Sequence, residues 1–220
     1  MLGMQRKDAL VRILKVVFGL LVFSFGEFVT ILGNIGITPW DTLSMGISYH
    51  VPLTFGQIHV GSALVILVID LLMKEKIGLG TVLDALLTGT FVDMWDFLIP
   101  FEGATNKWAG LVLLLLGMLI MAAGQVFYMS GGLSCGPRDS LLVAVGKRLP
   151  KIPIGYVDMI MKVVIVIVSY LIGGPIGFGT LIAMLGMGVA MQIVYSIFKF
   201  EPRNVVHEGI VTTFKHIFEK

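Results

Sequence analysis

The sequence predicts an all-α membrane protein with six transmembrane helices, arranged as two inverted-topology repeats of three helices, each with a re-entrant or interfacial half-helix after its first span. Three observations predict this fold: the composition, six long apolar runs and an internal repeat. Of the 220 residues, 56% are hydrophobic and only 14% are charged, and the mean hydropathy is +0.94. Roughly a quarter of the residues in a soluble domain are charged, so the composition excludes an ordinary soluble protein.

The six apolar runs have the length of membrane-spanning helices, which need roughly 20 mainly apolar residues. The first run continues past the length of a signal peptide and lacks a small-residue cleavage site, so we expect it to be retained as a span. In chain order, the expected spans are residues 11–32, 57–73, 78–98, 108–130, 156–172 and 177–198.

The basic residues predict the orientation of the spans. Fourteen of the sixteen lie before or in the first turns of the first span, between the second and third, between the fourth and fifth, or after the sixth, whereas the opposite loops hold only Lys107. The positive-inside rule therefore predicts a multi-pass protein of the cell membrane with both termini in the cytoplasm. The fourteen are Arg6, Lys7, Arg12, Lys15, Lys74, Lys76, Arg138, Lys147, Arg148, Lys151, Lys199, Arg203, Lys215 and Lys220.

The first half of the sequence recurs in the second half. A shift of 98 residues aligns Gly19/Gly117, Gly26/Gly124, Glu27/Gln125, Pro39/Pro137, Asp41/Asp139 and Leu43/Leu141. A shift of 99 then aligns His59/Asp158, residues 77–81 with 176–180, and Asp93/Gln192. Such self-similarity indicates two homologous halves, and because each holds three spans, an odd number, the second half enters the membrane from the opposite side.

This repeat divides the chain into residues 1–100, residues 101–200 and a tail. In the tail, residues 201–220, apolar side chains recur at helical spacing among lysines and a histidine. The pattern indicates an amphipathic helix, which either lies on the cytoplasmic membrane surface or docks against the bundle.

Two related motifs interrupt the apolar runs, at residues 36–43 and 133–141. Each has a proline, an aspartate two residues later, then a hydroxyl residue and a leucine, and its glycines and proline end the preceding helix. The segments that follow, residues 40–51 and 138–149, reach roughly 18 Å as helices, about half of a membrane. Their first turns carry free backbone N–H groups, which attract anions.

These two motifs, together with the Gly-Phe-Gly-Thr motif of residues 177–180, resemble those of the YczE/YitT-type family of bacterial integral membrane proteins. The resemblance runs from the first span to the sixth and leaves the tail outside. It implies a small protein of the bacterial cytoplasmic membrane, in a family with some members linked to secondary-metabolite or lipopeptide production, and it implies no catalytic residues. The first motif has Thr38 and Trp40 where the second has Gly136 and Arg138, so we expect the two halves to bind differently.

The candidate binding residues lie at the two motifs and in the first span. The predicted substrate contacts are Asp41, Thr42, Arg138, Asp139 and Ser140, and the arginine favours a carboxylate or phosphate. Glu27 lies deep in the first span and is aligned with an uncharged glutamine, which suits proton coupling. The alternative for Glu27 is a permanently protonated side chain that bridges helices.

Other polar residues in the apolar runs are costly in a bilayer and are therefore secondary candidates. Asp158 and Lys162, one helical turn apart, indicate an ion pair, and His59 is either a pH-sensitive ligand or a helix-packing residue. Four scattered histidines and one cysteine show no zinc spacing, so we expect no metal and no cofactor. The full secondary set is His59, Asp93, Gln125, Asp158, Lys162 and Gln192.

Two functional hypotheses follow, and neither is an enzyme, because the common catalytic motifs are absent. The first is a small secondary transporter, single or as a homodimer, that carries a small polar or anionic solute by alternating access, with Glu27 coupling it to protons. The second is a non-transporting membrane module, either the substrate-binding component of a vitamin importer or an auxiliary that anchors a biosynthetic enzyme. The Ala-x-x-x-Ala docking motif common in such importer components is absent from residues 11–32. The expected partners are the lipid bilayer and a small-molecule solute, and no nucleic acid.

Overall fold

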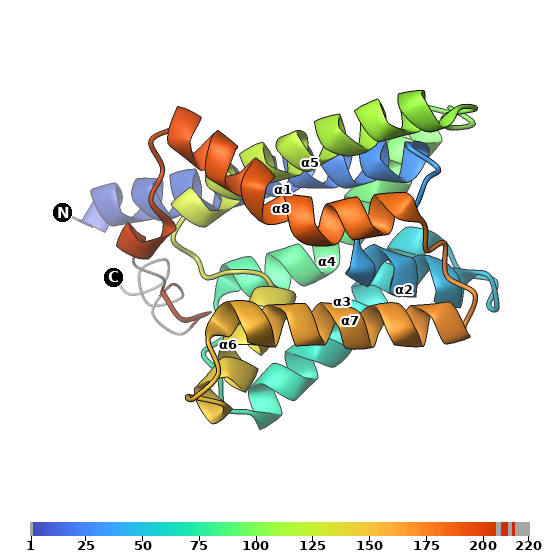
Figure 1. The fold of residues 1–220 in the computed structure, drawn as a ribbon. Helices are drawn as coiled ribbons and strands as arrows, with labels where there is room; N and C mark the ends of the chain where they lie inside the picture. The colour runs from blue at the N-terminus through green and yellow to red at the C-terminus, as the bar shows by residue number, and fades with distance from the viewer. Residues whose placement is uncertain (1, 206–207, 211–212, 214–220) are drawn as a thin grey trace.

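A computed structural model describes residues 2–205, 208–210 and 213, and these residues form an all-α bundle (Figure 1). Five of its helices, α1, α3, α5, α7 and α8, are long and apolar enough to cross a membrane. The predicted class, an all-α membrane protein, is therefore confirmed. The helices are α1 (Leu2–Leu32), α2 (Pro39–Ser48), α3 (Phe55–Leu72), α4 (Leu79–Leu98), α5 (Lys107–Ser130), α6 (Pro137–Arg148), α7 (Ile154–Leu171) and α8 (Phe178–Ile197), followed by the 3-10 helix η1 (Pro202–Asn204).

Helix α4 corresponds to the third predicted span but differs from the helices at the other five. It has 20 residues, the length of a span, yet it carries Asp84, Asp93 and Asp96 and is not among the five helices that qualify. Two of these aspartates contact other parts of the protein, because Asp84 lies against Gly136 and Asp93 against Gly56. The polar groups of α4 are thus partly accommodated inside the bundle.

The two short helices α2 and α6 lie where the interrupting motifs predict half-helices. Each begins at its proline, which suits the first helical position because proline lacks the N–H that would be unpaired there. The loops before them need left-handed backbone, with φ of +103° at Gly36 and +85° at Ser134. These are aligned positions, so in both halves the chain turns into the short helix in a similar way.

Helices α1 and α5, the first long helices of the two halves, form the most extensive contact in the bundle. They meet along glycines, with Gly19 against Gly124 and Gly26 against Gly117. A Cβ atom added to Gly26 would lie 2.5 Å from the Met121 backbone nitrogen, so the two backbones touch directly. Small residues are what allow such close helix packing in membranes.

Each short helix packs on the second long helix of the other half, α2 on α7 and α6 on α3. At the ends of these contacts, His50 Nε2 lies 2.8 Å from the Ile172 carbonyl oxygen, and Arg148 donates a 3.0 Å hydrogen bond to the Met73 carbonyl. His50 and Arg148 are aligned by the shift of 98, and the two carbonyl groups by the shift of 99. Equivalent side chains therefore bind the last turns of equivalent helices.

A second pair of hydrogen bonds joins the starts of α4 and α8 to the loops of the opposite half. The Gly80 N–H donates to the Leu133 carbonyl at 2.7 Å, and the Gly179 N–H donates to the Ile35 carbonyl at 2.8 Å. These four residues are again aligned pairs. Glycine is needed because a Cβ at either donor would collide with the facing backbone.

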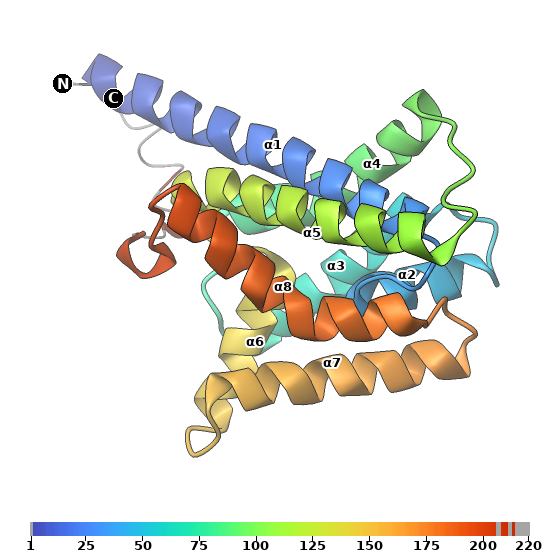
Figure 2. The same cartoon turned by 45° about the horizontal axis from the view of Figure 1, so that its top comes forward.

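The two halves differ in how their last two helices pack. Helix α3 packs closely on α4, whereas α7 and α8 are not among the closely packed pairs. In Figure 1, α8 lies with α5, and α7 runs along the opposite edge beside α6. Only 11% of the residues of α7 are buried, so much of its apolar surface faces outward. Figure 2 shows the same order from another side, with α1, α5, α8 and α7 in succession.

The predicted tail helix, residues 201–220, lies for most of its length outside the described residues. Within them, the Glu208 N–H donates to the Gly132 carbonyl at 2.9 Å, and the Ile210 N–H donates to the Ile77 carbonyl at 3.0 Å. Arg12 on α1 forms a 2.6 Å ion pair with Glu208. Residues 208–210 therefore lie against the loops that precede α4 and α6.

Asp93, on α4, binds the start of α3. Its carboxylate accepts a 2.8 Å hydrogen bond from the Gly56 N–H and another from the Thr54 hydroxyl. Hydrogen bonds to charged groups are worth about 1.5–3 kcal/mol, so Asp93→Ala should lower the free energy of unfolding by about 2 kcal/mol. Asp96→Ala, on the exposed face of the same helix, is the matched control. Denaturation in detergent measures both, and equal stability of the two variants would contradict the capping role.

Candidate functional site

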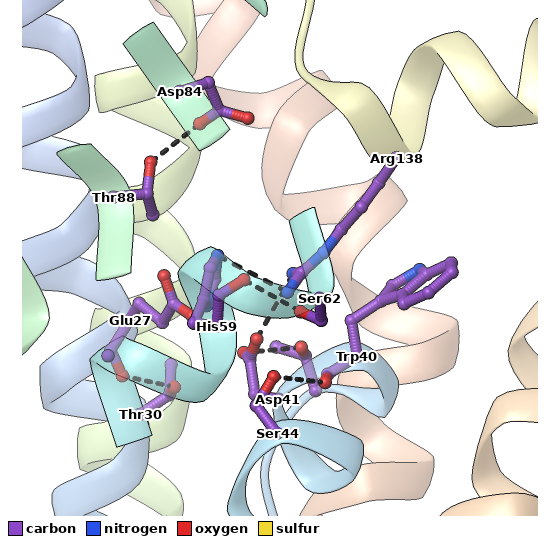
Figure 3. A network of polar contacts seen from close by, with 12 residues as sticks. Glu27, Thr30, Trp40, Asp41, Ser44, His59, Ser62, Asp84, Thr88 and Arg138 are labelled. Atoms are coloured by element: carbon purple, nitrogen blue, oxygen red, sulfur yellow. Dashed lines mark hydrogen bonds and ion pairs between the residues drawn. The ribbon is translucent and has the colours of Figure 1, made fainter. Parts of the chain in front are cut away.

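Four titratable or charged side chains from four helices meet in the interior of the bundle (Figure 3). They are Glu27 on α1, Asp41 on α2, His59 on α3 and Arg138 on α6, and we call them the central cluster. Glu27 and Asp41 are fully buried, and His59 is 4% exposed. His59 Nδ1 lies 3.0 Å from Glu27 Oε1, while Arg138 lies 3.3 Å from Asp41 Oδ1 and 3.4 Å from His59 Nε2. Asp41 and His59 of the first half thus contact Arg138 of the second, and Glu27 contacts His59.

Asp41 and Arg138 are both positioned by the first turn of a short helix. Asp41 lies in the first turn of α2, where its Oδ2 accepts a 2.6 Å hydrogen bond from the hydroxyl of Thr38, the residue before the helix. Arg138 is the second residue of α6 and extends toward α2, as Figure 3 shows. Its guanidinium carbon lies 5.4 Å from the centre of the Trp40 ring, within range of a cation–π interaction. Trp40 and Arg138 are aligned positions, so the two halves contribute the two sides of one contact.

The contacts of His59 determine its tautomer. A guanidinium group only donates hydrogen bonds, so the Nε2 atom that faces Arg138 accepts and the imidazole proton is on Nδ1, which faces Glu27. The imidazole is therefore neutral. Although the Nδ1–Oε1 distance is that of an ion pair, neither carboxylate oxygen of Glu27 accepts a hydrogen bond of good geometry within the described part of the chain.

The charges of the central cluster do not balance. Two buried carboxyl groups, Glu27 and Asp41, face one guanidinium group and one neutral imidazole. A buried charge without a partner is strongly unfavourable. The cluster therefore has the capacity for one further positive charge, either a proton or another cation.

Two further carboxyl groups lie next to the cluster. Asp84 accepts a 2.7 Å hydrogen bond from Thr88 and lies against Gly136 at the start of α6, where the helix dipole favours a negative charge. Asp139 accepts a 3.3 Å hydrogen bond from the Tyr128 hydroxyl on α5. Both carboxyl groups add to the acidic character of the region.

The predicted substrate contacts separate into two groups. Asp41 and Arg138 meet in the central cluster together with Glu27, the predicted proton-coupling residue. In contrast, the Thr42 hydroxyl donates a 2.6 Å hydrogen bond to a carbonyl of its own helix, and the Ser140 hydroxyl lies 3.8 Å from the thiol of Cys135. Asp139, as described above, is bonded to α5 and not to the cluster.

The secondary candidates also occupy different places. His59 belongs to the cluster, Asp93 caps α3, and Asp158 and Lys162 form the 2.6 Å ion pair that their spacing indicates. Gln125, aligned with Glu27, is 7% exposed and has an amide oxygen without a hydrogen-bond partner among the described residues. Gln192 is exposed on α8 and lines a surface pocket beside η1.

Sequence reasoning missed Thr38, Trp40 and Asp84 as parts of this region. The only signal for the first two was their difference from the aligned residues Gly136 and Arg138. Sequence reasoning also predicted no metal site, yet one ligand atom from each of Glu27, Asp41 and His59 lies within 4.8 Å of the other two. Carboxylate and imidazole groups together are able to hold a divalent cation, and such a set from three helices has no local spacing motif.

A family described as "Family of unknown function (DUF6198)" matches residues 10–196. The chain belongs to this family. The match to DUF6198 includes the whole central cluster and both short helices, and it leaves the tail outside, as the sequence resemblance indicated. The YczE-type resemblance is confirmed, because an "Uncharacterized membrane protein YczE" of Bacillus subtilis is 32% identical over 178 residues, which are 79% of this chain and 80% of that protein.

Two other proteins are similar to this DUF6198 chain over a comparable length. An "Uncharacterized protein" of Haemophilus influenzae is 25% identical over 82% of this chain and 81% of its own length. The "Uncharacterized protein YyaS" of Bacillus subtilis is 26% identical over 80% of this chain and 88% of its own length. No solved structure matches the chain.

A cavity of about 370 Å³ opens between the loop before α2 and the start of α8. Its lining includes Asn34, Ile176 and Gly177, which align with Gly132, Ile77 and Gly78 of the other half. The backbone of residues 208–210 contacts Gly132, Ile77 and Gly78. The cavity near the end of α1 is therefore open, whereas the aligned position in the other half, near the start of α1, is filled by residues 208–210 of the tail.

Proposed function

We propose that this protein is a secondary transporter of a small polar solute that works by alternating access and is coupled to protons through Glu27. The observation that carries the proposal is the central cluster, in which buried titratable groups of one half pair with an arginine of the other. Ionisable residues inside a membrane bundle are costly and mark ion or substrate pathways. Because the cluster joins the two halves, a movement of one half relative to the other would change the contacts of Arg138 with Asp41 and His59.

The proposal includes two inverted-topology repeats, with α4 as a span in addition to the five helices above and with α2 and α6 as re-entrant half-helices. Support comes from the paired contacts at aligned positions, such as those of His50 and Arg148 with the last turns of α7 and α3. Binding sites of inverted-repeat transporters lie near the membrane midplane, where discontinuous helices meet. The asymmetric distribution of basic residues further supports a cell-membrane orientation with both termini in the cytoplasm.

Alternating access requires that the two ends of the bundle open in turn. The cavity beside the loop before α2 is in keeping with access from one end, while residues 208–210 cover the aligned place at the other end. The Asp41–Arg138 ion pair links the two halves in this arrangement. A solute that competes for either partner would weaken this link and so favour movement, whether the protein works singly or as a homodimer.

The test is proton movement in vesicles that contain the purified protein and a trapped pH-sensitive dye. A panel of amines, amino acids, carboxylates and phosphates is added outside, one solute at a time. We expect at least one solute to change the internal pH with the wild type and with Asp96→Asn, an exposed control on α4, and we expect Glu27→Gln to lose this response. A response retained by Glu27→Gln would contradict its coupling role, and no response to any solute would favour the non-transporting module.

A further inference from the structure

We propose that the central cluster is a binding site for a small organic cation, an amine or a guanidine, and that the guanidinium group of Arg138 occupies this site when no solute is bound. The inference rests on the proposed function and specifies its substrate class. It also reverses the expectation from the sequence, in which Arg138 indicated an anionic solute. The reversal follows from what surrounds the arginine side chain.

The contacts of the Arg138 guanidinium are those that an organic cation needs. Asp41 supplies a carboxylate at 3.3 Å, His59 supplies an acceptor nitrogen at 3.4 Å, and Trp40 supplies an aromatic face at 5.4 Å. A carboxylate gives charge-assisted hydrogen bonds, and an indole ring is the best cation–π partner among the side chains. An external guanidine of similar shape would find the same three partners.

Glu27 adds an acceptor that Arg138 does not use. It is fully buried, and neither of its carboxylate oxygens accepts a hydrogen bond of good geometry from the described residues. One of these oxygens lies within 4.8 Å of ligand atoms of both Asp41 and His59. A second N–H group of a bound amine or guanidine has a partner there, so the site is incomplete with Arg138 alone.

The charges around the cluster favour a cation over an anion. Carboxyl groups lie in the cluster on α1 and α2 and beside it on α4, a fourth follows Arg138 on α6 and is bonded to Tyr128, and Lys162 on α7 is already bound to Asp158. Helices α2 and α6 each contribute roughly half a positive charge at their first turn, which does not balance the surplus. Helices α5 and α8 carry no acidic or basic residue except Lys107 at the far end of α5. The carboxyl groups are Glu27, Asp41, Asp84 and Asp139.

The same surplus predicts an exchange of the solute for a proton. With Arg138 as the internal cation, one carboxyl group of the cluster holds a proton, because two buried carboxylates with one cation are unfavourable. When an organic cation enters, Arg138 moves aside but stays next to the two carboxyl groups, the O–H bond of the protonated one breaks and its proton passes to water, so the summed charge of the two carboxylates, Arg138 and the solute stays at zero. Arg138, whose side chain is 23% exposed, withdraws toward the edge of the cluster.

A metal ion is the strongest competitor for this site. Glu27, Asp41 and His59 offer the necessary donor atoms, but Trp40 and the planar guanidinium beside it are suited to an organic ion. Divalent cations hold their water strongly and bind through oxygen and nitrogen lone pairs, which an indole ring does not offer. Metals therefore enter the test as an alternative outcome.

The test measures binding to the detergent-purified full chain by titration calorimetry. The probes are methylguanidinium and ethylammonium chloride, sodium acetate and phosphate, and the chlorides of manganese and zinc. We expect the wild type to bind the organic cations, Asp41→Asn to lose this binding, and Trp40→Leu to weaken it roughly fivefold by loss of the cation–π contact.

The decisive variant is Arg138→Gln, because the two substrate classes predict opposite signs. If Arg138 is an internal competitor, its removal should tighten the binding of methylguanidinium about tenfold, since the site is then always free. If Arg138 binds an anion, its removal should abolish binding of acetate or phosphate. Arg138→Lys keeps the charge and lacks the planar group, so it provides the same comparison, with a smaller change, should Arg138→Gln not fold.

Lys147→Gln is the matched control, a cation on the same helix whose side chain is 62% exposed, and it should leave every affinity unchanged. Binding of the metals but not of the amines, or binding of anions that Arg138→Gln abolishes, would overturn the proposal. Transport is tested separately. Proton movement driven only by anions would contradict the cation site but support transport, whereas amine binding without any proton movement would support the site but contradict transport.

Discussion

Alanine at Gly26 is expected to destabilise the protein strongly, whereas alanine at Gly61 is not. At Gly26 the new Cβ atom would lie 2.5 Å from the Met121 nitrogen and 2.7 Å from the Gly117 carbonyl oxygen. Both are backbone atoms of α5, so no side-chain rotation relieves the collision and the two helices must separate. Overpacking of this kind costs roughly 3 kcal/mol, a large share of the roughly 5–15 kcal/mol that stabilises a typical protein.

Gly61 on α3 is the matched control because a Cβ atom there would have no neighbour within 4 Å. Alanine is a better helix former than glycine by about 1 kcal/mol, so Gly61→Ala should be neutral or stabilising. The two variants thus differ in sign, and thermal unfolding followed by size-exclusion chromatography measures both. A melting temperature for Gly26→Ala equal to that of the wild type would show that α1 and α5 are not in backbone contact.

Removal of the Arg138 charge should destabilise the protein more than removal of the Asp41 charge. Arg138→Gln leaves the carboxyl groups of Glu27 and Asp41 without their cation, and breaking a buried ion pair in this way costs about 3–5 kcal/mol. Asp41→Asn removes one of two carboxyl groups and leaves Arg138 near Glu27, so the loss is smaller. The double variant should regain part of the stability lost in Arg138→Gln.

The measurement is denaturation of the wild type, the two single variants, the double variant and the control Lys147→Gln in detergent at two pH values. The loss in Arg138→Gln should be smaller at the lower pH, because protonation neutralises the carboxyl groups that lack a partner. Lys147→Gln removes an exposed partner of Glu75 and should cost at most about 1 kcal/mol. Equal losses in Arg138→Gln and Asp41→Asn at both pH values would contradict the surplus of carboxyl groups.

The helices and their starts were predictable from the sequence because they depend on local signals. The length of each apolar run placed the five membrane-length helices α1, α3, α5, α7 and α8. The proline of each motif placed the start of α2 and of α6. Helix α4 was predicted as a span like the others, and its three aspartates are the reason that it differs. Glycines and prolines at critical backbone positions recur at shifts of 98 and 99 residues, and the inverted repeat that they indicate stays a prediction.

The composition of the central cluster was only partly predictable. Glu27, Asp41 and Arg138 stood out because ionisable residues are rare in apolar runs, but the contact that joins Asp41 to Arg138 spans 97 residues and leaves no local pattern. The hydroxyl groups of Thr42 and Ser140 looked equivalent to the aspartates beside them. Helix geometry turned them inward, to a carbonyl of the same helix and to a cysteine, which residue type and spacing do not reveal.

The packing of α2 on α7 and of α6 on α3 has a consequence for the order of events during synthesis. When the first half has left the ribosome, the partner helix of α2, α7, has not been made. The arginine that pairs with Asp41 is 97 residues further along the chain. At roughly 5–20 residues per second, the synthesis of these residues takes about 5–20 s. During this time the first half has a short helix without its main contact surface and two carboxyl groups without a cation. A single half is therefore an unfinished structure, which is completed only when the second half of the same chain has been made.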